Sequence, residues 1–419
     1  MTNKSKVINF GCRLNIYEGE VIKSLIQKNN LSNYIIINSC SVTQDAEKKV
    51  EYEIRKSKRH FPEKKIIVTG CAAQINPEKY SSIKEVDYVI GNKEKLQNNT
   101  WSFLLNKPAV QVKNIFEENK LENNTIHKFE GKSRAFIEIQ QGCDHRCTFC
   151  IIPFGRGNNR SVPVGIVVER IKSLVNNGYN EVVLTGVDIT DYGNDLPGKP
   201  NLFQLVKRIL NLIPNLKQLR LSSLDCAEID EDFWEVLNDK RLMPHFHLSL
   251  QSGNDLILKR MKRRHNRQQA INFCQKVKSI RKDVVFGADL IAGFPTETDE
   301  MFYDSIELIN ECELTHLHVF PYSIRKDTPA SKMPQVAIDI IKKRAKILRE
   351  AGNKRMQKYL QKQIGNYATM LVEQSKENTS FGKSQHFTKI KINKVINEGR
   401  LVNCLITDVN DDILNAKLI

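Results

Sequence analysis

Short apolar runs alternate with amphipathic, helix-length stretches through the first hundred residues of the chain. The runs cover residues 7–10, 34–37, 66–68 and 86–90. A strand followed by a helix, repeated along a chain, is typical of a small parallel sheet with crossover helices. We therefore expect an N-terminal α/β domain over residues 1–105, then a polar linker rich in Asn, Glu and Lys over residues 106–131.

The same alternation resumes after the linker and predicts a central domain over residues 132–333. Six further strand-like runs lie there, at residues 135–140, 181–186, 218–223, 245–251, 284–293 and 315–322. Helix-length segments such as 165–176 and 202–213 separate them. Six βα units predict a partly closed (β/α)6 barrel whose active site lies at the carboxyl ends of the strands.

Beyond residue 333 the pattern changes twice. Residues 334–364 are basic and amphipathic, which predicts a helix interrupted near Gly352. Residues 365–419 contain short β-rich runs separated by turns, which predict a small all-β barrel. In this last domain Phe381 and Phe387 could stack on bases, although a place in the barrel core is the more ordinary interpretation. The expected fold class is α/β with a small all-β domain at the end.

The 419-residue chain carries a formal charge of +16, and that charge is concentrated in two segments. Residues 255–282 carry a net +9 and residues 334–364 a net +7, which together equal the whole excess. Solvated helix faces are the plain alternative, but this concentration favours a polyanionic partner, most simply nucleic acid. No stretch resembles a signal peptide or approaches the roughly 20 apolar residues of a membrane span, so we expect a soluble, cytoplasmic monomer.

Three of the N-terminal apolar runs end at a cysteine, in "VINFGC", "IIINSC" and "IIVTGC". These are Cys12, Cys40 and Cys71. Because the carboxyl ends of parallel strands share one edge, where open α/β sheets bind ligands, we expect the three side chains to meet. In a reducing compartment such clustering indicates metal or redox chemistry. Four other cysteines match no motif and are expected to pack in cores: Cys226, Cys274, Cys312 and Cys404.

A second set of cysteines follows the first strand of the central domain, in "CDHRCTFC". Cys143, Cys147 and Cys150 offer three thiolates in CxxxCxxC spacing over the mouth of the barrel. A structural zinc site with His145 as its fourth ligand is one interpretation, but zinc motifs use two separated ligand pairs and no second pair follows nearby. Three thiolates suit a four-iron cluster that leaves one iron open.

This loop, with Phe149 before its last cysteine, resembles the radical S-adenosylmethionine (SAM) superfamily. The resemblance implies that the open iron chelates the amino and carboxylate groups of SAM, and that an electron from the cluster cleaves the sulfonium to a 5′-deoxyadenosyl radical. "FGCRLNIYEGE", "NSCSVTQDAEKKV" and "TGCAAQINPE" are in turn similar to the N-terminal domain of methylthiotransferases. "LTGVDITDYG", "LRLSSLDCAEI", "DLIAGFPTET" and a closing TRAM-like domain agree, so the resemblance covers nearly the whole chain.

The methylthiotransferase resemblance implies that Cys12, Cys40 and Cys71 hold a second, auxiliary four-iron cluster. One SAM methylates a sulfur on that cluster, and another yields the radical that removes hydrogen from an unreactive carbon. Such a carbon needs no general base, so no catalytic residue beyond the cluster ligands is expected. The resemblance also implies an electron donor such as flavodoxin or ferredoxin.

Members of this family act on N6-threonylcarbamoyladenosine next to the tRNA anticodon, on isopentenyladenosine at the same place, or on an aspartate of a ribosomal protein. "GCRLN" at residues 11–15 is similar to the threonylcarbamoyl group, whereas the other two groups show GCQMN and GCPKN. An arginine could form a bidentate pair with the threonyl carboxylate, so we expect Arg13 to help recognise that base. The non-enzymatic alternative is an RNA-binding protein stabilised by metal.

Further candidate site residues are placed by position alone. The expected SAM contacts are Phe149 in the cysteine loop and, at strand ends, Gly186, Asp188, Ser223, Gln251 and Gly293. For the strand-end residues, turns and helix caps compete as explanations. Arg156 and Arg160 in "FGRGNNR" are candidates for contact with a phosphate or a cofactor carboxylate. In "LKRMKRRHNR" the candidates for contact with RNA phosphates are Lys262, Arg263, Arg264 and Arg267.

Overall fold

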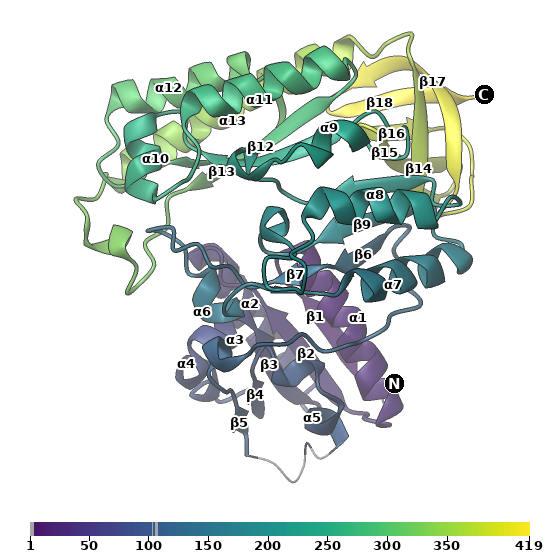
Figure 1. The fold of residues 1–419 in the computed structure, drawn as a ribbon. Helices are drawn as coiled ribbons and strands as arrows, with labels where there is room; N and C mark the ends of the chain where they lie inside the picture. The colour runs from purple at the N-terminus through teal and green to yellow at the C-terminus, as the bar shows by residue number, and fades with distance from the viewer. Residues whose placement is uncertain (1–3, 103, 105–107) are drawn as a thin grey trace.

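The N-terminal domain is a five-stranded parallel sheet in the order β1-β2-β3-β4-β5. A computed structural model describes residues 4–102, 104 and 108–419 of the chain (Figure 1). The strands are β1 (Lys6–Asn9), β2 (Tyr34–Ser39), β3 (Lys65–Gly70), β4 (Tyr88–Ile90) and β5 (Val110–Gln111). The helices are α1 (Arg13–Lys28), α2 (Gln44–His60), α3 (Cys71–Ile75), α4 (Pro77–Ser81) and α5 (Asn98–Ser102). Because the sequence order of the strands is also their spatial order, β1, β2 and β3 end side by side.

The fifth strand comes from the segment expected as a linker. The boundary expected at 105/106 lies outside the described residues. Beyond it, β5 pairs in parallel with β4, and Ile115 and Phe129 are buried. The segment 108–131 therefore packs on the two domains that it connects. Its few apolar residues are too widely spaced to produce a strand or helix period, which is why sequence pattern alone reads it as linker.

The central domain contains the six parallel strands that the sequence predicts. They are β6 (Ala135–Glu138), β9 (Glu181–Thr185), β10 (Gln218–Leu221), β11 (His245–Gln251), β12 (Val285–Ala292) and β13 (Leu314–Pro321). They form two three-stranded sheets, β6-β9-β10 and β11-β12-β13, joined by the isolated bridges Leu219↔Leu242 and Leu224↔Leu248. Covering helices are α7 (Val164–Asn176), α8 (Leu202–Leu212), α9 (Asp232–Val236), α10 (Asp255–Met261), α11 (Arg267–Ile280) and α12 (Asp299–Glu311). This confirms a partial (β/α)6 barrel.

A short ribbon fixes the loop that carries the second set of cysteines. β7 (Gln140–Gln141) pairs with β8 (Arg160–Ser161) in antiparallel fashion, so residues 142–159 leave and return at one point. Within this loop lies the short helix α6 (Ile152–Arg156), which packs against α3 of the N-terminal domain. The cysteine loop of the barrel is thus also an interdomain contact.

The basic segment after the barrel forms one uninterrupted helix, α13 (Ile338–Gln361). The interruption expected near Gly352 is wrong. Gly352 is buried within the helix, and a Cβ atom there would lie 2.9 Å from the Cβ atom of Leu317 on β13. The glycine therefore allows α13 to approach the sheet closely and does not break the helix.

The C-terminal domain is a closed five-stranded barrel in the order β14-β15-β16-β18-β17 (Figure 1, yellow). Its strands are β14 (Tyr367–Lys376), β15 (Thr379–Ser384), β16 (Lys389–Ile392), β17 (Leu401–Asn410) and β18 (Ile413–Leu418). Its core contains Met370, Ile390 and Cys404, whereas Phe387 lies outside that core, in the turn between β15 and β16. Among the described residues, no helix has the length and apolar character needed to cross a bilayer.

Candidate metal centres and the barrel lumen

The three N-terminal cysteines lie at the carboxyl ends of adjacent strands, as the sequence predicts. Cys12 caps α1 just beyond β1, Cys40 follows β2 directly, and Cys71 follows β3 and opens α3. A Cβ atom on Gly11 would lie 2.6 Å from the Sγ atom of Cys40, so the backbone at Gly11 rests on that sulfur. Burial, with a smaller contribution from the thiols of Cys71 and Cys12, raises the pKa of Cys40 to about 11.

A buried arginine from the barrel reaches the N-terminal cysteines. The Nε atom of Arg156, the last residue of α6, donates a hydrogen bond of 3.1 Å to the Sγ atom of Cys71. Its Nη2 atom donates to Glu18 at 3.0 Å, and further hydrogen bonds reach Glu18 and Asn15. Burial opposes the charge on Arg156, but Cys71 and Glu18 outweigh it and raise the pKa of the guanidinium. A fixed positive charge therefore lies against a potential thiolate.

This contact corrects the expectation for the "FGRGNNR" stretch. Arg156 is 1% exposed and bound to the protein, so a phosphate or a cofactor carboxylate has no access to it. Arg160 is also buried and donates to the carbonyl oxygens of Arg156 and Asn158. Both arginines fix the cysteine loop from inside, a role for which the local sequence carries no signal.

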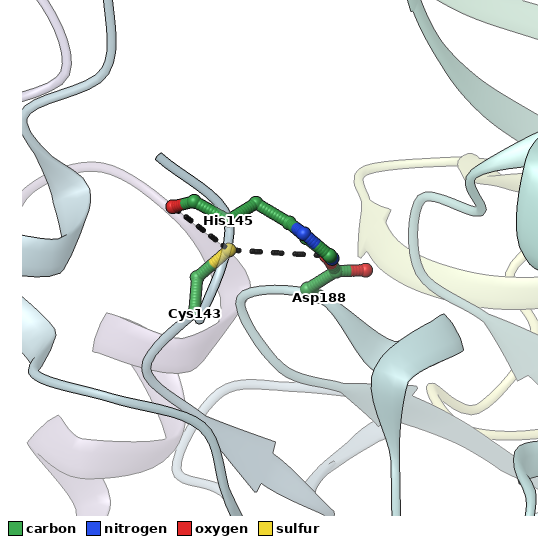
Figure 2. A group of neighbouring side chains, drawn as sticks. All are labelled: Cys143, His145 and Asp188. Atoms are coloured by element: carbon green, nitrogen blue, oxygen red, sulfur yellow. Dashed lines mark hydrogen bonds and ion pairs between the residues drawn. The ribbon is translucent and has the colours of Figure 1, made fainter. Parts of the chain in front are cut away.

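The second cysteine set occupies the loop between β7 and β8. Cys143, Cys147 and Cys150 are all half-buried. Figure 2 shows Cys143 beside Asp188 and His145: its Sγ atom lies 3.8 Å from Asp188 Oδ2, and His145 Nε2 lies 3.2 Å from the same oxygen. Burial raises the pKa of Cys143 and raises that of Cys150 to about 12.

An arginine side chain also contacts the second cysteine set. The Nη1 atom of Arg263 lies 3.7 Å from the Sγ atom of Cys147, and its Nη2 atom donates to Asp225 at 2.7 Å. Burial opposes the charge, but Asp225 and Cys147 outweigh it and raise the pKa of Arg263. Each cysteine set thus has one arginine, held by a buried carboxylate, that donates to one of its sulfurs.

The sulfur spacing distinguishes between a single zinc ion and a larger cluster. Tetrahedral zinc with thiolates at about 2.3 Å needs its ligand atoms about 3.8 Å apart. Among the described residues, four groups of possible ligands lie within 4.8 Å of one another, and none contains two cysteines. The zinc interpretation with His145 finds only Cys143, His145 and Asp188 in such a group. In neither set do all three sulfurs lie within 4.8 Å of one another, and burial raises the pKa of Cys12, Cys40, Cys143 and Cys150. Both features fit a cationic cluster in which each sulfur binds a different iron.

The expected SAM contacts differ in their packing and hydrogen-bond partners. Phe149 packs edge-on against Phe294, with ring centroids 6.3 Å apart. Gly186 lies against Gln140, whose side-chain oxygen accepts hydrogen bonds from the backbone of Val187 and Asp188 at 2.9 Å each. Burial alone would raise the pKa of Asp188, but hydrogen bonds from His145 and Thr190 outweigh it and lower that pKa.

Three further strand-end residues complete that set. Ser223 is half-buried beyond β10, and Gln251 ends β11 with a φ of 69°. Gly293 packs on α13, because a Cβ atom there would lie 2.5 Å from Ile341. Close approach to α13 explains the glycine at 293 without a ligand.

The basic stretch expected to contact RNA is largely committed to internal ion pairs. Arg263 is bound as described above, Arg264 pairs with Glu228 and with Asp225 at 3.2 Å, and Arg267 pairs with Glu311 at 2.5 Å. Lys262 is exposed in a left-handed turn after α10. Carboxylates from distant parts of the chain neutralise these arginines, which a local charge count cannot reveal.

The lumen of the barrel contains a group of cations that sequence reasoning missed, apart from Arg13. Arg13 points toward Phe387, with its guanidinium carbon 5.6 Å from the ring centroid. Arg134, Arg220 and Lys383 approach the same ring. The sequence signal for Arg13 is the cysteine before it, whereas the other three carry none.

Two family descriptions match the chain. Residues 137–309 match the radical SAM superfamily, and residues 4–91 match an uncharacterized protein family, UPF0004. The first covers the barrel from β6 to α12, and the second covers the N-terminal sheet through β4 with its three strand-end cysteines.

Curated relatives match almost end to end. The chain is 48% identical over 417 residues to the threonylcarbamoyladenosine tRNA methylthiotransferase MtaB of Rickettsia prowazekii, covering 99% of this chain and 98% of that protein. It is 35% identical to the protein of the same name from Aquifex aeolicus, covering 94% and 98%. It is 31% identical to a tRNA-2-methylthio-N(6)-dimethylallyladenosine synthase of Hydrogenobaculum, covering 90% and 89%. Among solved structures, the radical SAM methyltransferase TsrM from Kitasatospora setae shares the fold, with a TM-score of 0.58 at 14% identity over 79% of this chain and 77% of that one.

Proposed function

We propose that this chain, which belongs to the methylthiotransferase family of the radical SAM superfamily, converts N6-threonylcarbamoyladenosine next to the tRNA anticodon to its 2-methylthio derivative. Two relatives that are 48% and 35% identical to the chain bear the name of this activity. The observation that carries the proposal is a contact from the loop that bears one cysteine set to a cysteine of the other: Arg156, six residues after Cys150, donates to Cys71. A sulfur held at one site and a radical formed at the other must meet at one carbon, and α6 holds the two sites together.

The cysteines are assigned as ligands of two four-iron clusters. Cys143, Cys147 and Cys150 would hold the cluster that binds SAM, and Cys12, Cys40 and Cys71 would hold the auxiliary one. When bound, these groups supply a carbon-centred radical and a methylated sulfur. Burial raises the pKa of Cys40 and Cys143, so a cation must compensate their ionisation. Arg156 and Arg263, which donate to Cys71 and Cys147, place a positive charge beside each set.

The residues around the first cysteine set are proposed to position SAM. Asp188, ionised and beside Cys143, is suited to accept hydrogen bonds from an ammonium group. Phe149, Gly186, Ser223, Gln251 and Gly293 stay proposed contacts. For Gly186 and Gly293 close packing is already a sufficient reason for the glycine, so Asp188 is the most informative of the six to substitute.

A tRNA partner fits a basic hollow between the barrel and the C-terminal domain. Its volume is about 600 Å³, and five of its lining residues are cations from the two basic segments: Lys278, Lys282, Arg355, Lys358 and Lys362. Helices α11 and α13 bring these segments together beside β14. Asp283 and Glu313 also line the hollow, and Lys278 pairs with Glu313 at 3.2 Å. Among the described residues the other four cations have no ion-pair partner, so they are better supported candidates for phosphate contact than Arg263, Arg264 and Arg267, whose charges are already paired. Lys262 keeps its place among the proposed contacts.

The remaining partners follow from the chemistry. A radical enzyme of this kind needs a one-electron donor such as flavodoxin or ferredoxin, and a tRNA-modifying enzyme would work in the cytoplasm. We propose that it acts as a monomer.

The deciding experiment is mass spectrometry of tRNA nucleosides from a strain that lacks the gene. Loss of 2-methylthio-N6-threonylcarbamoyladenosine supports the proposal, whereas loss of the isopentenyl derivative would assign the chain to the other tRNA group. If neither nucleoside were lost, an aspartate of a ribosomal protein would be the favoured substrate. Metal analysis of the purified protein separates these enzymes from a metal-stabilised RNA-binding protein, because two clusters require about eight irons per chain and no zinc.

A further inference from the structure

The floor of the barrel lumen is a cationic site to which all three domains contribute. Four cations surround the ring of Phe387: the guanidinium carbons of Arg134 and Arg220 lie 5.2 Å from its centroid, that of Arg13 lies 5.6 Å away, and Lys383 Nζ lies 4.7 Å away. Arg13 comes from the N-terminal domain, Arg134 and Arg220 from the central barrel, and Lys383 and Phe387 from the C-terminal barrel. We call this group the lumen floor.

The charges of the lumen floor are not balanced. Arg134 and Arg220 share the buried Glu181, at 2.6 and 2.8 Å, and Arg134 also pairs with Glu373 at 2.8 Å. Among the described residues, neither Arg13 nor Lys383 has an ion-pair partner. Burial, partly offset by Glu373, lowers the pKa of Lys383 to about 8. Enclosed positive charge without a counterion is costly, so this arrangement favours an anionic ligand.

Other acids of the lumen do not supply that anion. Asp289 on β12 acts electrostatically on Arg13 without forming an ion pair with it, and its carboxylate contacts His247 at 2.9 Å and His318 at 3.2 Å. The Phe387 ring stacks on His245 at 5.4 Å with an interplanar angle of 8°, which fixes the turn after β15 against the barrel; Lys383 lies near the end of that strand. The site is therefore built, and its two unpaired cations are held in place.

Two features connect this site to the surface and to the auxiliary cysteines. A cavity of about 400 Å³ beside β13 and α13 is lined by Lys383 and Phe387 together with His316 and His318. Arg13 follows Cys12 directly, so their Cα atoms are about 3.8 Å apart. Cys12 belongs to the auxiliary trio, whereas the Arg13 side chain reaches the lumen floor. A substrate placed for sulfur transfer would have its far end near Arg13.

We propose that the lumen floor binds the carboxylate of the substituent on the target adenosine, with Arg13 and Lys383 as the two cations that contact it. This inference rests on the proposed function and deepens it, because it makes the C-terminal barrel part of the substrate pocket. A carboxylate at the end of a base substituent is the first part of the nucleotide to enter the pocket, so it can reach the lumen floor. A backbone phosphate lies on the other side of the base and could reach the lumen floor only if the base entered first. The planar guanidinium of Arg13 also matches a two-oxygen carboxylate.

The test measures binding by the full-length protein of two anticodon stem-loop RNAs. One RNA carries N6-threonylcarbamoyladenosine, and the other carries the same base with its carboxylate converted to the neutral carboxamide. We expect the wild-type protein to bind the acid roughly 10- to 100-fold more tightly than the amide. Arg13→Gln and Lys383→Gln should each move this ratio toward one and leave affinity for the amide unchanged. Arg208→Gln and Lys207→Gln, on the exposed face of α8, are matched controls that should keep the full ratio.

Each other outcome overturns the proposal in a distinct way. An unchanged acid-to-amide ratio in both variants would show that the carboxylate binds elsewhere. Equal loss of affinity for acid and amide would show that the site binds an RNA phosphate. Iron content and the unfolding temperature of each variant, together with recovery of the ratio in Arg13→Lys, separate loss of recognition from loss of folding. Because binding is measured, the result stands whether or not the expected nucleoside disappears from the deletion strain, so this inference and the proposed function fail separately.

Discussion

Arg156 Nε lies 3.1 Å from Cys71 Sγ, although the two residues are 85 positions apart and belong to different domains. The helix that ends at Arg156 begins two residues after Cys150, so a single short segment connects the two sets of cysteines. The buried carboxylate of Glu18 binds both Arg156 and Lys95, the latter at 2.7 Å, and thereby holds the arginine in place. A buried charge network, and not packing alone, joins the barrel to the N-terminal domain at this point.

Replacing Arg156 with Gln should damage the auxiliary site selectively. Removing one partner of a buried ion pair costs about 3–5 kcal/mol of unfolding free energy, and here it also removes the donor to Cys71. We expect iron per chain, after anaerobic reconstitution, to fall from about eight toward about four. Arg208→Gln is the exposed control. Retention of full iron content in R156Q would contradict this role.

Gly11→Ala should act on the same site through geometry. The new Cβ atom would lie 2.6 Å from Cys40 Sγ, and the φ of 90° at Gly11 is strained for any residue with a side chain. We expect about half of the iron to be lost. Gly131→Ala isolates the collision, because Gly131 also has a positive φ, of 63°, but has open space around it. Equal iron loss in both variants would mean that backbone strain, and not contact with Cys40, is responsible.

Binding of the acidic base should weaken as pH rises through about 8. Lys383 faces Glu373, Arg134, Arg220 and Lys389, and burial, only partly offset by Glu373, holds its pKa near 8. Above that pH the amine is neutral and no longer attracts a carboxylate, so the acid-to-amide affinity ratio should fall between pH 7 and pH 9. Lys383→Arg should keep a high ratio across this range. Lys383→Gln should show a low ratio that does not change with pH, and a sloping ratio in that variant would implicate another group.

The same lowered pKa has a consequence for stability. The amine titrates near 8 when folded and at about 10.5 when unfolded, so between these values the unfolded chain binds more protons. The contribution of Lys383 to the free energy of unfolding should therefore rise with pH from about 8 to about 10.5. A comparison of wild type with Lys383→Gln by denaturant unfolding at pH 7.5 and pH 10 measures it.

Two glycine-to-alanine substitutions should have opposite signs. Alanine favours the helix over glycine by about 1 kcal/mol, but at position 352 its Cβ atom would lie 2.9 Å from Leu317. We expect Gly352→Ala to lower the free energy of unfolding by about 1–2 kcal/mol. Gly165→Ala, in the first turn of α7 with nothing within 4 Å, should raise it by about 0.5 kcal/mol. Stabilisation by both would show that α13 can move away from β13.

Salt dependence of tRNA binding should identify the phosphate contacts. Lys282 and Lys358 line the basic hollow and, among the described residues, have no ion-pair partner. Replacing either with Gln should reduce the slope of log affinity against log salt by about 0.7. Arg267→Gln should leave the slope unchanged, because Arg267 is paired with Glu311. A reduced slope in Arg267→Gln, together with an unchanged slope in both lysine variants, would indicate that the basic stretch after α10 contacts the RNA instead.

Much of this arrangement could be predicted from local sequence. The strand period and the turn residues predict the six barrel strands and the small C-terminal barrel, because the residues at the ends of each strand mark its boundaries. Parallel topology then placed Cys12, Cys40 and Cys71 at one edge, because strand ends of a parallel sheet coincide. Of the four cysteines outside any motif, Cys274, Cys312 and Cys404 are buried, as expected, whereas Cys226 is only half-buried beside the core. The segment 108–131 and the continuity of α13 at Gly352 were misread, because both depend on what packs against them.

The amino-acid sequence by itself determined which residues can bind metal and the order in which they lie along the chain. Only the tertiary structure decided which charges are free. Arg263 and Arg267 carry the same charge as Arg13, but carboxylates from distant segments neutralise the first two and leave the third without a partner. Electrostatic energy depends on distance through space, and the distances between residues of different domains are set only when the chain folds.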